Sequence, residues 1–130
     1  ILNNMRYLLS LSFFLISMIG LGQPTYLDLF IQFDQYPNET SWLITQGTDT
    51  VFTSPSYDFQ QYVGASIEER LFLESGVEYK FYMNDDFGDG ICCDFGPGYF
   101  TLENACDGLV VEDLEFAGSS VDYTFTLAPC

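Results

Sequence analysis

Apolar and polar residues alternate along several short stretches of this chain, which is the pattern of half-buried β-strands. The clearest stretch is residues 26–33, where Leu27, Leu29, Ile31 and Phe33 fall on one face. Comparable alternation or short apolar runs, separated by turn residues, recur over residues 41–46, 50–53, 66–74, 77–83, 98–103, 109–112 and 120–127. About eight short strands predict an all-β fold, an antiparallel β-sandwich or jelly roll.

Residues 66–74 leave two alternatives open, because Ile67, Leu71 and Glu74 also fit the spacing of a helix. A strand is favoured, since Leu71 and Leu73 alternate and the next segment alternates strongly. No internal repeat, linker or low-complexity tract interrupts the chain. The pattern therefore predicts one domain.

An apolar segment near the beginning predicts a secretory signal peptide. Met5 is the expected start after a few upstream residues, Arg6 supplies a positive charge, and small residues precede a cut after Gly22. The alternative, a membrane anchor, needs about 20 apolar residues, more than this segment offers. We expect removal of residues 1–22 and a secreted or cell-surface domain of residues 23–130.

Charge limits the partners of this domain. The part from residue 23 onward holds all 19 acidic residues but only Arg70 and Lys80 of the three basic ones, so its formal charge is 2 − 19, or −17. Nucleic acids and anionic membranes are polyanions, which excludes both as natural partners. The chain has no histidine, so the commonest general base and the usual zinc ligand are missing.

An acidic, glycine-containing stretch at residues 84–94 predicts a cation site. Its four aspartates are Asp85, Asp86, Asp89 and Asp94, and its glycines allow several oxygens to converge on one point. Calcium takes six to eight oxygen ligands, which this composition can largely supply. The order differs from the helix–loop–helix calcium pattern, because a phenylalanine holds the third place. The alternative is a solvated turn whose aspartates cap their own backbone.

Four cysteines indicate disulfide bonds in an oxidising compartment. They are Cys92, Cys93, Cys106 and Cys130. A bond between sequence neighbours is strained, so we expect Cys92 and Cys93 each to pair outward, one with Cys106 and one with Cys130. The sequence leaves open which pairs with which.

Two motifs together resemble a secreted module found in Bacteroidota and marine eukaryotes. They are the segment 36–42, read as YPxETSW, and the segment 85–93, read as DxxGDGICC, followed by a Gly-Pro-Gly-Tyr-Phe run. The similarity spans most of residues 27–127. The resemblance implies a disulfide-bonded β-sandwich that serves as an accessory unit on surface or secreted proteins. It also implies that Glu39 lies near the aspartate loop.

Three aromatic residues, one in a predicted strand and two in a later loop, are candidates for ligand binding. Trp42, Tyr57 and Phe59 could form a platform on which sugar rings stack; alternatively, Trp42 belongs to the core and the loop aromatics cover one end of the sandwich. Two short motifs predict glycosylation. Asn38 begins an Asn-Glu-Thr sequon, and Thr50 lies in an Asp-Thr-Val motif that resembles the O-glycosylation acceptor of Bacteroidota.

These features predict a non-catalytic protein, because without histidine only a glycosidase-like carboxylate pair remains as a simple catalytic device. We expect a secreted structural or adhesive β-sandwich, stabilised by calcium, that assembles into an extracellular fibre or surface layer. Its partners would be copies of itself, joined by exchange of the apolar strand 26–33 or by bridging cations. The alternative is a carbohydrate-binding module whose partners are glycans.

Overall fold

The computed structural model describes residues 22–130, and the predicted all-β sandwich is confirmed. The predicted signal peptide lies outside the described residues, apart from Gly22. The elements, in chain order, are β1 (Pro24–Gln32), the 3₁₀ helix η1 (Pro37–Glu39), β2 (Thr40–Gln46), β3 (Asp49–Thr53), α1 (Phe59–Tyr62), β4 (Ser66–Glu74), β5 (Glu78–Asp85), β6 (Cys92–Cys93), β7 (Gly96–Pro97), β8 (Tyr99–Asn104), β9 (Gly108–Asp113) and β10 (Ser120–Thr126).

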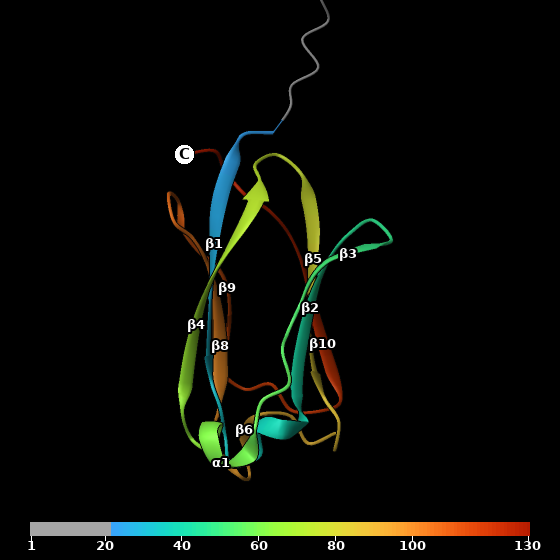
Figure 1. Cartoon of the computed structure of the whole chain (residues 1–130), viewed down its shortest axis with the longest axis vertical. Helices are drawn as coiled ribbons and strands as arrows, with labels where there is room; N and C mark the ends of the chain where they lie inside the picture. Colours follow the sequence, from blue (N-terminus) through green and yellow to red (C-terminus); the bar gives the residue numbers. More distant parts are fainter. Residues whose placement is uncertain (1–21) are drawn as a thin grey trace, which may run out of the picture.

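Two four-stranded antiparallel sheets face each other (Figure 1). The first has the order β4-β1-β8-β9 and the second the order β10-β5-β2-β3, while β6 and β7 form a separate two-stranded ribbon. Figure 1 places η1, α1 and β6 together at one end of the sandwich, which we call the loop end. The C-terminus and the start of β1 lie at the opposite end.

Strand β1 is internal rather than free. It pairs along its length with β4 and over residues 27–32 with β8, both antiparallel. The apolar N-terminal strand therefore completes its own sheet in this structure, and the edges of the two sheets are β4, β9, β10 and β3. Strand exchange through residues 26–33 would have to break both pairings, and it stays a prediction.

The alternating residues form the core between the sheets. Leu27, Leu29 and Ile31 of β1 are fully buried, as the period-two pattern predicts. Phe81 of β5 meets Phe100 of β8 across the two sheets, with ring centroids 5.4 Å apart. Burial of each such side chain contributes about 1.5–3 kcal/mol, so the facing strands hold the sandwich closed.

Local signals explain the connections. Gly47, with φ of +58°, opens the tight turn from β2 to β3, a conformation that glycine adopts without cost. Asp58 caps the single turn of α1 by accepting hydrogen bonds from the backbone N–H groups of Gln60 and Gln61. Residues 66–74 are a strand, as favoured over the helix. No helix among residues 22–130 has the length and apolar character needed to span a membrane.

Candidate metal centre

The acidic loop is held in place by its first aspartate. Asp85 ends β5 with a buried side chain, and its Oδ2 accepts hydrogen bonds from the backbone N–H groups of Gly88, Asp89 and Gly90 at 2.7, 3.0 and 3.1 Å. Gly90 has φ of +77°, and a Cβ there would collide with the carbonyl oxygen of Phe116. The loop therefore needs glycine at this position, and it wraps tightly around one carboxylate.

A second segment brings Glu39 to the same place. Glu39 ends η1, and its carbonyl oxygen accepts a hydrogen bond from the backbone N–H of Asp86 at 2.9 Å. One carboxylate oxygen each from Glu39, Asp85 and Asp89 lie within 4.8 Å of one another. We call these three residues the carboxylate triad. The expectation that Glu39 lies near the aspartate loop matches this geometry.

The spacing of the triad is compatible with one shared metal ion. Calcium–oxygen distances of about 2.3–2.6 Å put opposite ligands of one ion about 4.6–5.2 Å apart. The triad oxygens, all within 4.8 Å of one another, can therefore share a single ion of this size. An all-oxygen donor set is the kind that hard cations select.

The electrostatics of the triad are unfavourable without a cation. Burial is the main cause that raises the pKa of Asp85, against the lowering by its three backbone hydrogen bonds, and the charge of Asp89 raises it further. Burial is also the main cause that raises the pKa of Glu39, and the neighbouring aspartates add to it. Asp34 belongs to the same environment: burial first, then the charges of Asp85 and Asp89, raise its pKa. We call the triad together with Asp34 the acidic cluster. Like charges held this close disfavour full ionisation unless something neutralises them.

The chain's own basic residues do not neutralise the acidic cluster. Residues 22–130 contain two, and each forms an ion pair on a strand: Arg70 with Asp28 at 2.6 Å and Lys80 with Asp122 at 2.8 Å. Neutralisation of the acidic cluster therefore has to come from protons or from cations in solution.

A buried hydroxyl lies beside the cluster without a partner. Within residues 22–130, the Oγ1 of Thr40 is the one buried side-chain polar atom that makes no hydrogen bond. Thr40 is directly opposite Asp85 in the pairing of β2 with β5, and both side chains are buried. Cross-strand neighbours have Cβ atoms about 4.5–5.5 Å apart. An unpaired buried hydroxyl costs about 1–3 kcal/mol, which a bound ion or its water would offset.

Two of the predicted ligands lie outside the cluster. Asp86 and Asp94 are exposed, and neither belongs to the group of converging carboxylates among the described residues. Asp86 follows the end of β5, and Asp94 lies in the turn between β6 and β7. Asp34, by contrast, was missed by the sequence interpretation. Its one signal was an acid directly after the apolar strand 26–33, at a position the fold buries.

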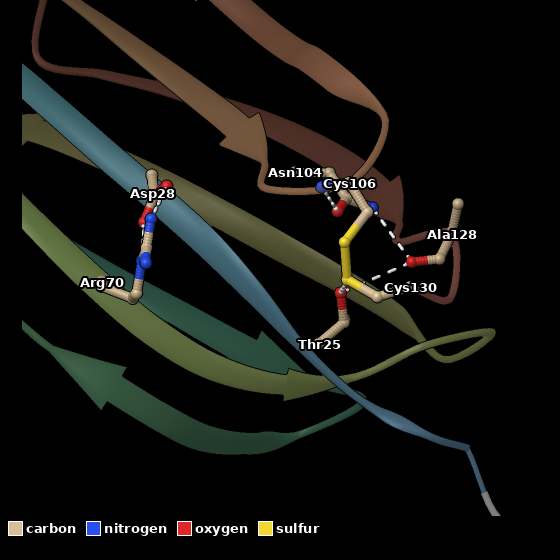
Figure 2. Close-up of a disulfide and its surroundings, with 7 residues drawn as sticks. All are labelled: Thr25, Asp28, Arg70, Asn104, Cys106, Ala128 and Cys130. Carbon is tan, nitrogen blue, oxygen red and sulfur yellow. Dashed lines mark hydrogen bonds and ion pairs between the residues drawn. A yellow bond between two sulfur atoms is a disulfide. The ribbon is translucent and has the colours of Figure 1, made fainter.

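The predicted disulfide pairing is wrong. Cys92 is bonded to Cys93, and Cys106 to Cys130 with Cα atoms 5.3 Å apart. Figure 2 shows the second bond, with Thr25 and Ala128 around it. The physical reason is distance. Cys92 and Cys93 lie at the loop end, and Cys106 follows the six residues of β8, about 20 Å away along the strand, whereas bridged Cα atoms lie within about 7 Å.

The structure divides the three predicted platform aromatics. Trp42 and Tyr57 are buried, and the Nε1–H of Trp42 donates to the hydroxyl oxygen of Tyr57 at 2.8 Å. Both side chains belong to the core, which for Trp42 was the alternative to the sugar platform, and neither has a free face for a ligand. Phe59 is exposed and lies 6.3 Å from Tyr36, measured between ring centroids. The two predicted glycosylation residues, Asn38 and Thr50, are both exposed.

Other aromatic rings surround the triad instead. Tyr36, Phe87 and Phe95 are exposed and, with Glu39 and Asp89, line a cavity of about 170 Å³. The sequence did not predict these three rings as ligand-binding residues, because each stands between strands, where no periodicity shows; Tyr36 and Phe87 entered only as members of the two motifs. The cavity gives the triad a solvent-open side, so a cation could enter without unfolding of the loop end.

Comparison with known proteins identifies no relatives: no family model, no curated protein and no solved structure matches this chain.

Proposed function

We propose that this chain is a secreted, non-catalytic structural or adhesive module whose loop end is held together by a bound calcium ion. The observation that carries the proposal is the convergence of the carboxylate triad within 4.8 Å. The unpaired hydroxyl of Thr40 and the lack of a basic neighbour support it. Calcium would join η1 to the end of β5 and the loop that follows β5, two segments that lie far apart in the sequence.

A direct test is calcium titration of chelator-treated protein by isothermal calorimetry, alongside thermal denaturation in calcium and in chelator. The proposal predicts saturable binding at about one ion per chain and a higher melting temperature with calcium. Absence of heat at millimolar calcium, with an unchanged melting temperature, contradicts it. Magnesium is the control cation, because it demands a smaller and more regular coordination sphere.

An enzymatic reading of the triad is less favoured. Two carboxylates about 5–5.5 Å apart are also typical of retaining glycosidases. The cavity beside Glu39 and Asp89 measures only about 170 Å³, however, and small-molecule sites usually have about 300–1,000 Å³. One oxygen of the Asp85 carboxylate, Oδ2, already accepts hydrogen bonds from three backbone N–H groups. These features suit a small ion better than a sugar ring with its leaving group.

Self-assembly is a second candidate role, favoured by the four open strand edges of the two sheets. Edge strands present unpaired backbone groups to other chains. The high negative charge opposes close approach of copies, so the assembly we propose depends on bridging cations. Negative-stain microscopy with calcium and with chelator tests it: ordered assemblies only with calcium support it, and monomers in both conditions contradict it.

A further inference from the structure

A hollow lies away from the acidic cluster, on the outer face of the sheet β4-β1-β8-β9. It has a volume of about 630 Å³. Because Leu27, Leu29 and Ile31 point into the core, the intervening Asp28 and Phe30 of β1 point outward onto this face. We call this hollow the sheet groove.

Two pairs of aromatic rings lie on this face of the sheet, one in the sheet groove and one beyond its end. Phe30 of β1 and Tyr99 of β8 form a pair with centroids 5.4 Å apart and planes tilted by 31°. Tyr26 and Phe72 form a second pair beyond one end of the groove, with centroids 4.8 Å apart, and Phe72 is 64% exposed. Tyr26 and Phe30 are four residues apart on one strand, which separates the pairs by about 13 Å.

Polar groups fill the space between the two pairs. Asp28 and Arg70 form a two-pronged ion pair at 2.6 and 2.7 Å, visible in Figure 2. Of the other residues that line the groove, Glu68, Glu103 and Glu112 are acidic, and Tyr99 and Thr101 carry hydroxyl groups. Ionised carboxylates only accept hydrogen bonds, so the groove offers many acceptors and few free donors. A complementary ligand supplies donors and flat apolar surfaces in alternation.

We infer that the sheet groove binds a polysaccharide chain that carries no anionic groups. Sugar rings present apolar faces that stack on aromatic side chains, and their hydroxyl or amino groups donate to carboxylates. The acidic lining repels sulfated or uronic-acid chains. An extended peptide fits less well: peptides pair with sheet edges through backbone hydrogen bonds, and a sheet face leaves those groups without partners. This inference is independent of the proposed calcium ion.

The test is a titration of the ¹⁵N-labelled protein followed by amide chemical shifts, in excess chelator so that the calcium proposal does not affect the result. The probes are β-1,4-linked hexasaccharides of glucose, N-acetylglucosamine and glucosamine, an anionic uronic-acid hexasaccharide, and hexalysine. A neutral or amino hexasaccharide is expected to shift the amides of β1 and β8 around Phe30 and Tyr99. Tyr99→Ala should weaken this binding about tenfold, the effect of losing one good stacking contact.

Tyr82→Ala is the matched control, because Tyr82 is a partly exposed strand tyrosine of the other sheet. It should leave the dissociation constant unchanged. Three results overturn the inference: no shifts from any neutral or amino sugar at millimolar concentration, shifts confined to the loop end, or binding by hexalysine alone. The last would identify the groove as a site for basic peptides. The wild-type titration decides between these results even if Tyr99→Ala does not fold.

Discussion

Neutralising Asp89 should stabilise the metal-free protein and at the same time remove its response to calcium. Among the described residues, the Asp89 side chain accepts no hydrogen bond, so Asp89→Asn changes its charge and little else. At 4.8 Å two unit charges repel by about 0.9 kcal/mol even at the dielectric constant of water. Asp89 faces two other carboxylates of the triad, so the variant should gain about 2 kcal/mol at low ionic strength.

Thermal denaturation in chelator and in calcium measures both effects. A gain of about 2 kcal/mol corresponds to a melting temperature roughly 8 °C higher for a domain of this size. Calcium at 100 times its dissociation constant should stabilise the wild type by about 2.7 kcal/mol. If the substitution weakens affinity a hundredfold, the same calcium concentration stabilises the variant by only about 0.4 kcal/mol. The order of the two melting curves should therefore reverse between chelator and calcium.

Asp86→Asn is the matched control, since Asp86 lies three residues away, is exposed, and stands outside the triad. It should shift neither curve by more than about 0.5 kcal/mol, as is usual for surface substitutions. Destabilisation of the chelated protein by Asp89→Asn, or a calcium response of this variant equal to that of the wild type, would contradict the proposed role of Asp89. The same reversal in Asp86→Asn would also contradict it.

Three further predictions concern the fold and the acidic cluster. Replacing Cys106 and Cys130 together by serine should cost about 3.5 kcal/mol in chemical denaturation, because their bond spans 24 residues; an unchanged midpoint contradicts this. Trp42→Phe should cost about 1–3 kcal/mol by leaving the buried Tyr57 hydroxyl unpaired, and adding Tyr57→Phe should recover part of that loss. In chelator, the raised pKa values of Asp34, Glu39 and Asp85 mean that the folded chain keeps protons that the unfolded chain has released. The free energy of unfolding should therefore fall as pH rises from about 4 through those raised values. The fall should be smaller in Asp89→Asn. A free energy of unfolding that rises with pH over this range would contradict the raised pKa values.

The sandwich was predictable because its strands carry their own signal. Residues such as Leu29 and Phe81 alternate with polar neighbours, and the alternation decides which face enters the core. Strands β6 and β7 have two residues each, too few for any period to show. Helix α1 is a single turn that depends on the cap at Asp58 rather than on an apolar pattern.

The candidate site was only partly predictable. Asp85 and Asp89 stand in a recognisable acidic loop, but the sequence does not say which loop carboxylates turn inward. That depends on tertiary contacts, as when the loop amides close on Asp85 and leave Asp86 exposed. Asp34 joins the cluster from another segment.

The cysteine pairing and the platform aromatics failed for a similar reason. The predicted pairing excluded a bond between Cys92 and Cys93 without considering at which end of the sandwich each cysteine lies. The position of each cysteine depends on the length of the strands between them. Trp42 and Tyr57 are joined by a long-range hydrogen bond inside the core, which composition cannot reveal.

The most direct measurement is a crystal structure of the protein grown with calcium, with anomalous data collected to identify the ion. The proposal predicts one calcium between Glu39, Asp85 and Asp89, with carboxylate oxygens at about 2.3–2.6 Å. Crystals grown at saturating calcium that hold only water there, or calcium at Asp86 or Asp94 instead, would contradict it.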